Sequence, residues 1–183
     1  MSKPILLLIL AFALFQGACS KEKTSRETNP YGDGPKTAVP AAFQANWMYG
    51  QFSMTEYWSQ NPAGYIGNAF EMAIAFRFHA NGTCEQYFTS RTVSGGVSTY
   101  HQSLSKGTVE INEAAKTITT HAHTAHYKQT RDGQTREDRD LDASEITATT
   151  SYTYEQVTEP NGAKAIYLKM NGTGNALTFL QKF

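Results

Sequence analysis

Two histidines with metal-ligand spacing stand in a threonine-rich stretch, His121 and His123. Side chains at positions i and i+2 of a strand project from one face, so both imidazoles could reach one zinc or copper ion. A third ligand would have to come from a neighbouring strand, for which His79, Glu85 and His101 are candidates. The alternative is a polar, solvated strand face, which could still respond to pH because imidazole titrates near pH 6.5.

Other residue patterns with catalytic or cation-binding chemistry are sparse. Residues 138–145 space carboxylates like the start of a calcium loop, but Ala143 replaces the required glycine and Thr149 the bidentate glutamate. The chain has no Gly-x-Ser-x-Gly elbow, no His-Glu-x-x-His motif and no glycine-rich phosphate loop. Cys84 is expected to be a small buried residue rather than a nucleophile. We therefore expect neither an enzyme nor a bound cofactor.

The charge balance excludes several classes of protein. Lys and Arg together number 16 and so do Asp and Glu, so there is no basic surface of the kind that binds nucleic acid. Only 17% of the residues are charged while 12% are aromatic. Coiled coils and disordered chains contain more charge and fewer aromatics, so the sequence predicts a globular domain.

The first 18 residues have the composition of an export signal. Lys3 precedes an apolar run of eleven residues, 5–15. As a helix this run would span about 16 Å, half of what a membrane-spanning helix needs. Residues 16–19, Gln-Gly-Ala-Cys, resemble the lipobox of bacterial lipoproteins. The resemblance implies cleavage before Cys19 and its acylation, as by palmitate; the alternative is an ordinary secretory signal that leaves a free thiol.

Residues 19–40 are expected to be the lipid anchor and a flexible tether. This stretch contains Pro30, Pro35, Pro40, Gly32 and Gly34 among mostly polar residues, and it has no apolar periodicity. The sequence is thus divided into a signal peptide (1–18), an anchor with its tether (19–40) and one folded domain (41–183).

The domain is predicted to be all-β. In residues 69–79, apolar side chains at 70, 72, 74, 76 and 78 alternate with small or polar ones, which is typical of a strand buried on one face. Asn-Gly or Asp-Gly turns follow at 81–82, 132–133, 161–162 and 171–172. Further strands are predicted at 47–57, 83–89, 97–102, 107–112, 117–129, 147–157, 163–170 and 175–183. About eight to ten short strands with hairpin connections indicate an antiparallel barrel or sandwich.

Three features resemble the small lipocalin-like lipoproteins of Gram-negative bacteria, within the calycin group. Trp47 opens the first predicted strand, residues 76–83 form a strand–turn–strand, and residues 176–183 form a last strand. The resemblance covers residues 41–183. It implies an up-and-down β-barrel of eight strands with an internal cavity, and it does not identify a ligand.

Aromatic side chains are the candidate ligand-binding residues if the barrel holds such a cavity. An apolar cup would be lined by Trp47, Phe70, Met72, Phe76, Phe78, Tyr152, Tyr154 and Tyr167. The same residues could instead simply fill a core.

The sequence thus predicts a monomeric lipoprotein of the Gram-negative cell envelope. We expect it to be held in the outer membrane through its lipid anchor and to carry a small apolar ligand. The alternatives are a non-catalytic envelope interaction protein with a filled barrel, and a metal-binding module built on His121 and His123.

Overall fold

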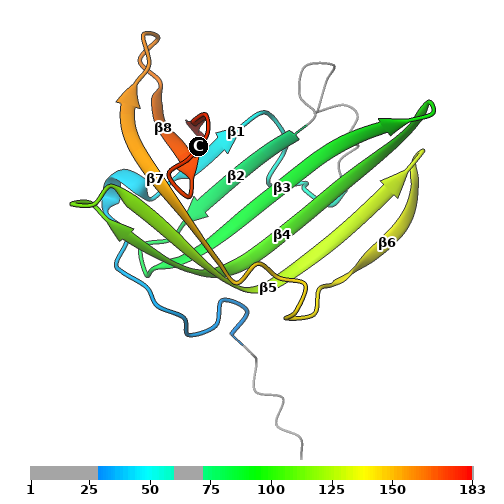
Figure 1. Ribbon diagram of the computed structural model, residues 1–183, viewed down its shortest axis with the longest axis horizontal. Coiled ribbons are helices and arrows are strands. Elements are labelled where there is room, and N and C mark those ends of the chain that lie inside the picture. The colour runs from blue at the N-terminus through cyan, green and yellow to red at the C-terminus, as the bar shows by residue number, and fades with distance from the viewer. Residues whose placement is uncertain (1–28, 60–71, 183) are drawn as a thin grey trace, which may run out of the picture.

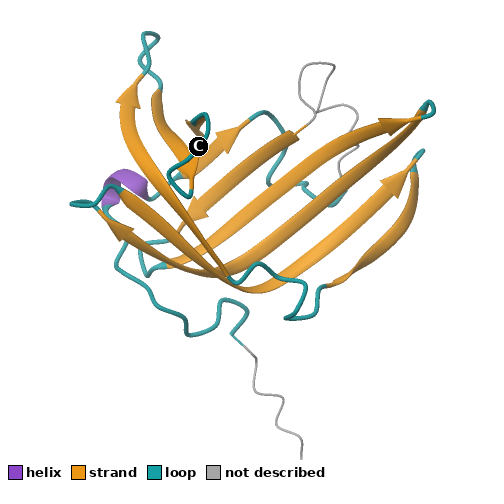
Figure 2. Ribbon diagram, in the orientation of Figure 1, coloured by secondary structure: helices purple, strands orange, loops and turns teal. Residues whose placement is uncertain are grey.

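The computed structural model describes residues 29–59 and 72–182. The predicted signal peptide, Cys19 and Phe70 lie outside these ranges. The described part is built of strands with one short 3₁₀ helix (Figure 2). None of the helices in this part is long and apolar enough to cross a bilayer.

Nine strands form one antiparallel sheet, which confirms the predicted all-β class. The elements, in chain order, are η1 (Ala41–Phe43), β1 (Asn46–Tyr49), β2 (Met72–Phe78), β3 (Thr83–Ser94), β4 (Val97–Asn112), β5 (Thr117–Arg131), β6 (Gln134–Asp140), β7 (Thr149–Thr158), β8 (Lys164–Met170) and β9 (Leu177–Lys182). The Asp132-Gly133 turn joins β5 to β6 with a positive φ at both residues (48° and 76°), as a two-residue hairpin requires.

The strand pairings close into a ring. Hydrogen bonds run from β1 through β2, β3, β4, β5, β7, β8 and β9, and β9 pairs with β1 again. β6 stands outside the ring and pairs with β5. The long strands β3, β4 and β5 run past the shorter ones and give the sheet a broad curved extension (Figure 1).

β5 changes its partner halfway along its length. Residues 117–121 pair with β7, and residues 126–131 pair with β6. Residues 122–125 lie between these two pairings, where a β-bulge also shifts the register of β5 against β4 at Lys106 and Gly107. The ring is therefore irregular at this one position.

One end of the ring interior is filled by aromatic and aliphatic side chains. Phe76 lies at its centre, with ring centroids 5.6 Å from Phe78, 5.6 Å from Tyr152 and 5.4 Å from Phe179. The indole Nε1–H of Trp47 donates a 2.9 Å hydrogen bond to the carbonyl oxygen of Phe43 in η1. The short helix is thereby fastened to the core that it covers.

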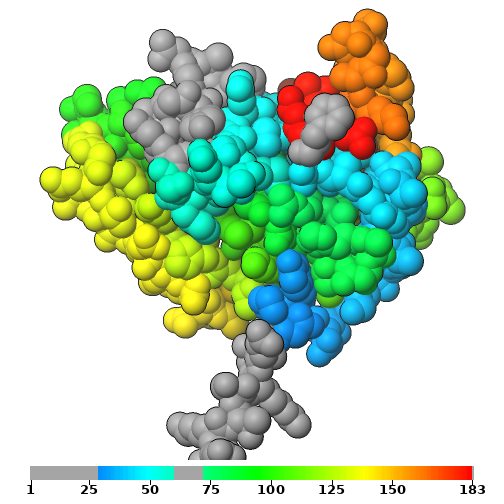
Figure 3. Space-filling view, turned by 180° about the vertical axis from the view of Figure 1, so that it is seen from behind, coloured from blue at the N-terminus to red at the C-terminus, as the bar shows by residue number. Residues whose placement is uncertain are grey.

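The outer face of β2 is buried as well, which differs from the expected strand with one buried face. Ala73 and Ala75 are both fully buried under a second apolar cluster. That cluster includes Phe52 and Tyr57 from residues 50–59, which lie over the outside of the sheet. Figure 3 shows residues of this stretch, in cyan, lying across the green strands.

Residues 29–40, expected to belong to a flexible tether, also lie against the sheet. Thr124 Oγ1 donates a 2.8 Å hydrogen bond to the carbonyl oxygen of Pro30, and the hydroxyl of Tyr31 donates one of 2.9 Å to Glu85. The backbone N–H of Thr37 bonds to the carbonyl oxygen of Val109 at 3.0 Å. Residues 29–40 therefore belong to the folded unit and are not a free tether.

Candidate functional site: a cleft inside the ring

A cleft of about 330 Å³ opens on the inner face of the sheet, beside the filled aromatic end. Its walls are β3, β4, β5, β7 and the end of β8, and the connection between β6 and β7 covers it. The lining residues are Cys84, Gln86, Ser103, Ser105, Lys106, Gly107, Thr120, Ala122, Ala125, Leu141, Glu145, Ile146, Thr147, Thr150, Tyr152 and Met170. The cleft thus lies where β5 exchanges one partner strand for another.

Gly107 allows the backbones of β4 and β5 to approach each other closely at the bulge in the cleft wall. A Cβ atom at this position would lie 1.9 Å from the carbonyl oxygen of His121 and 2.8 Å from the Cα of Ala122. No side chain fits there without movement of β4 or β5. The local shape of the wall therefore depends on glycine.

The lining combines neutral hydrogen-bonding groups with apolar ones. Ser103 and Ser105 come from β4, and Thr150 and Tyr152 come from β7. Leu141, Ile146 and Met170 are among the residues that supply apolar surface. Such a surface can bind one small amphipathic molecule, because it offers hydrogen bonds and apolar contact together.

Tyr152 and Cys84 line the cleft and are uncharged when they carry their proton. Both keep that proton at neutral pH. Burial raises the pKa of the Tyr152 phenol to about 12. Burial likewise raises the pKa of the Cys84 thiol to about 12, and the thiol donates a 3.4 Å hydrogen bond to the carbonyl oxygen of Thr108. A nucleophilic thiol needs a lowered pKa, so Cys84 remains a packing residue, as expected from the sequence.

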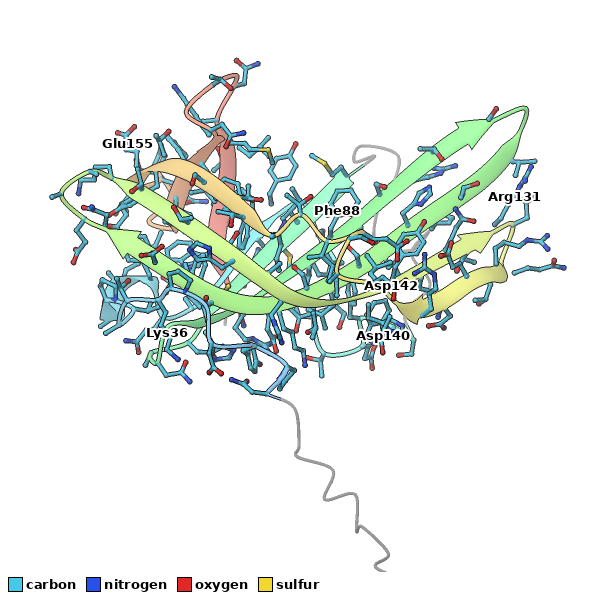
Figure 4. All side chains as sticks on the ribbon, turned by 60° about the horizontal axis from the view of Figure 1, so that its bottom comes forward. Lys36, Phe88, Arg131, Asp140, Asp142 and Glu155 are labelled. Atoms are coloured by element: carbon cyan, nitrogen blue, oxygen red, sulfur yellow. The ribbon has the colours of Figure 1, made fainter. Side chains whose placement is uncertain are left out.

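The connection that covers the cleft is held at both of its ends. The N–H of Leu141 bonds to the carbonyl oxygen of Ala125 at 2.8 Å, and that of Ala122 bonds to the carbonyl oxygen of Ala148 at 2.9 Å. In Figure 4 the chain leaves β6 at Asp140 and passes Asp142 on its way to β7. Residues 141–148 thus bridge the stretch of β5 that β6 and β7 leave unpaired.

Most of the aromatic residues predicted to bind a ligand lie in the filled core instead. Trp47, Phe76, Phe78 and Tyr154 are at most 5% exposed and belong to the inner apolar cluster. Tyr152 is part of this cluster and also lines the cleft.

The remaining predicted ligand residues do not join this set. Met72 begins β2 and is only partly buried. Tyr167 lies between the inward-facing Ile166 and Leu168 and therefore faces outward. Its hydroxyl donates a 3.0 Å hydrogen bond to Glu159. Among the described residues, only Tyr152 of the predicted set contacts the cleft.

The structure does not bring the histidines together as metal ligands. His121 bonds to Glu110 at 2.8 Å through Nε2 and to the Thr149 hydroxyl at 3.3 Å through Nδ1. His123 is exposed and lies against Gly32. No group of three or more potential ligands occurs within residues 29–59 and 72–182.

His101 and Glu85, which were suggested as third metal ligands, have other partners. Nδ1 of His101 lies 2.6 Å from the hydroxyl of Tyr127 on the inner face. Glu85 is bound by the hydroxyls of Tyr31 and Tyr87 and by Arg77.

His126 was not among the residues singled out from the sequence. In the described part of the chain it contacts two carboxylates. Its Nδ1 lies 2.8 Å from Asp140 and its Nε2 lies 2.8 Å from Asp138. Partial burial lowers the pKa of this imidazole, but the two carboxylates outweigh burial and hold it above its usual value. The Trp58 ring packs edge-on against it at 4.8 Å.

The polar residues of the cleft could not be identified by a search for apolar strand faces. Gln86, Ser103 and Ser105 carry small or polar side chains inward, where an apolar parity is normally sought. The sequence did hold one indication of the cleft. Gly107 follows Ser103 and Ser105 at the same spacing, and a glycine inside a strand often marks a bulge.

No family model, no curated protein and no solved structure matches the chain.

Proposed function

We propose that this protein is a lipid-anchored protein of the Gram-negative cell envelope that binds one small amphipathic ligand in the inner cleft. In this proposal the ring of eight strands is an up-and-down barrel of lipocalin-like type, filled at one end and open to a ligand beside the filling. The protein works as a monomeric carrier or receptor and not as an enzyme.

The observation that carries the proposal is the mixed lining of the cleft. A volume of about 330 Å³ is at the lower end of the range for small-molecule sites. Hydroxyl groups such as those of Ser105 and Thr150 lie on the same surface as Leu141 and Ile146. A core of a merely structural domain has no reason to keep such a space open, because filling it would add stability.

The proposed ligand is amphipathic, whereas the sequence led us to expect an apolar one. The aromatic residues that would have bound it are packed against one another, as the contacts of Phe76 with Phe78 and Phe179 show. The remaining space is bounded by hydroxyl and amide groups as well as by aliphatic ones. An amphipathic ligand matches this lining better than a hydrocarbon does, because a hydrocarbon would leave the polar groups without partners.

The anchor is supported by the lipobox resemblance at residues 16–19. Residues 29–40 are fastened to the sheet by Tyr31 and Thr37 among others. Only residues 20–28 separate Cys19 from residue 29, and nine residues can span at most about 30 Å when fully extended. The proposed carrier would therefore work close to the membrane.

The anchor is tested by fractionating cells that produce the wild-type protein or Cys19→Ser. We expect the wild type in the outer membrane, and the variant released or left as an unprocessed precursor. A cleaved, unacylated wild-type protein would contradict the anchor.

The ligand site is tested with a filled cleft. Ser105→Trp places a large ring in the cleft, whereas Ser94→Trp places the same ring at the exposed end of β3. We expect saturable binding of neutral amphipathic probes to the wild type and to Ser94→Trp, and its loss in Ser105→Trp at unchanged circular dichroism. If none of the probes binds to the wild type, the interaction protein with a filled barrel becomes the better account.

A further inference from the structure

The two charged residues of the cleft lining are already engaged with other groups. Arg139 Nη1 and Nη2 donate hydrogen bonds of 2.7 Å each to the two carboxylate oxygens of Glu145. The ammonium group of Lys106 lies 5.8 Å from the ring centroid of Tyr31, which reaches the outer face of the sheet. The charge of Glu145 is therefore neutralised by Arg139, and the charge of Lys106 lies beside an aromatic ring on the outer face of the sheet.

The other hydrogen-bonding side chains of the lining carry no charge. They are the hydroxyls of Ser103, Ser105, Thr147, Thr150 and Tyr152 and the amide of Gln86, together with the Thr120 hydroxyl and the Cys84 thiol, which already donate to backbone carbonyl oxygens. Burial keeps Tyr152 and Cys84 in their neutral forms at physiological pH. The described lining thus offers hydrogen bonds without a free counter-charge.

We propose that the cleft selects an uncharged amphipathic ligand, whose polar group is a hydroxyl or an amide rather than a carboxylate, phosphate or ammonium. This inference rests on the proposed function and specifies the ligand class of the same site. An ion that leaves water needs an opposite charge or many hydrogen bonds in return, and its desolvation otherwise costs more than apolar contact gains. A hydroxyl or amide needs one or two hydrogen bonds, which this lining supplies.

Probes of equal chain length that differ only in the polar group test the inference. The mature chain (residues 19–183) carrying Cys19→Ser is titrated at pH 7.5 with 1-octanol, octanoate and octylammonium, and binding is followed by NMR chemical shifts. We expect 1-octanol to bind at least ten times more tightly than either ion. Octanoate is then titrated at pH 4, where most of it is the neutral acid, and we expect it to approach the affinity of 1-octanol while circular dichroism shows the fold retained.

A charge placed in the cleft provides the reciprocal test. Ser105→Asp adds a carboxylate to the wall, and Ser94→Asp adds one at the exposed end of β3 as the matched control. We expect Ser105→Asp alone to bind octylammonium more tightly than 1-octanol.

The outcomes separate this inference from the function on which it rests. Binding of octanoate or octylammonium to the unsubstituted site as tight as that of 1-octanol would overturn the selection of uncharged ligands and leave the binding site in place. Absence of binding for all three probes, at both pH values, would overturn the proposed function and the inference with it.

Discussion

Arg139 at the end of β6 holds Glu145 in the middle of the connection that covers the cleft. The two hydrogen bonds of 2.7 Å use both Nη atoms and both carboxylate oxygens, and Arg139 Nε also bonds to Glu137 at 2.6 Å. Hydrogen bonds to Arg139 hold the pKa of Glu145 at about 2, so the pair stays charged at every physiological pH. The contact ties the cover to the strand from which it starts.

Removal of this contact is expected to change how fast a ligand leaves. In Arg139→Gln the cover keeps its backbone hydrogen bonds at Leu141 and Ala148 but loses its side-chain tie. We expect 1-octanol to dissociate several times faster, as measured by NMR line shapes, with a smaller change in the fold's stability. Arg136→Gln, an exposed change on the same strand, is the control. Equal dissociation rates in all three proteins would mean that the cover does not restrict the ligand.

Gly107→Ala tests the bulge in the cleft wall. The new Cβ would lie 1.9 Å from the carbonyl oxygen of His121, so β4 and β5 must separate locally. We expect a loss of about 1–3 kcal/mol in the free energy of unfolding, measured by urea titration, and weaker probe binding. Ser105→Ala, two residues earlier on the same face, is expected to cost less than about 0.5 kcal/mol. A Gly107→Ala protein as stable as the wild type would show that the two strands are not held so closely.

Ala75→Asp tests the second apolar layer outside the ring. Ala75 is fully buried in the cluster that contains Phe52, Tyr57 and Tyr87. A carboxylate there would be buried without a partner, so we expect a loss of about 3 kcal/mol or more. Ala114→Asp, in the exposed turn between β4 and β5, should stay within about 0.5 kcal/mol of the wild type. A small effect at Ala75 would mean that residues 50–59 do not cover this face in solution.

The His126 contact predicts that stability decreases as pH rises. The pKa of His126 is raised in the folded protein by Asp140 and Asp138. The stabilisation is therefore complete below about pH 6.5, the value in the unfolded chain, and is lost as pH rises through the higher pKa of the folded state. Because these pairs are partly exposed, each contributes less than about 1 kcal/mol.

Unfolding titrations at a series of pH values check this expectation. The decrease should be present in the wild type and in His123→Gln, whose histidine is exposed, and absent in His126→Gln. A decrease that survives in His126→Gln would assign the pH dependence to another group.

The strands were predictable because their signals are local. Alternation around Phe76 and the Asp132-Gly133 turn depend only on neighbouring residues, and both agree with the structure. The burial of Ala75 was not predictable in this way, because residues 50–59, which cover it, come from a different part of the sequence. An alanine between larger residues indicates equally well a solvated face and a tightly packed one.

Residues 29–40 show how composition can mislead. Proline and glycine here are typical of a tether, yet Gly32 and Gly34 serve close packing. A Cβ at Gly32 would lie 2.5 Å from the ring of His123, and one at Gly34 would lie 2.8 Å from the hydroxyl of Thr108. Gly34 is needed for its small size, and Gly32 for its small size and for its φ of 64°, which glycine adopts without strain. No pattern within the segment itself reveals the strands on which it lies.

The cleft was also beyond a local argument. Its existence depends on β5 leaving β7 after His121 and joining β6 at His126. That exchange is decided by which strands meet in space, so the inward-facing Ser103 and Ser105 could not be separated from ordinary solvated positions. The aromatic residues around Phe76 lie inside the ring, where they fill the space.

The most direct test of the account maps where 1-octanol binds on the isotopically labelled mature chain with Cys19→Ser. We predict saturable NMR shift changes for the amides of Ser103, Ala122 and Ala125, which line the cleft, with little change at Trp47 or Tyr167. Saturable binding at this wall would support a ligand site inside the ring. Shift changes that never saturate, or that cluster on the outer face around Tyr167, would contradict it.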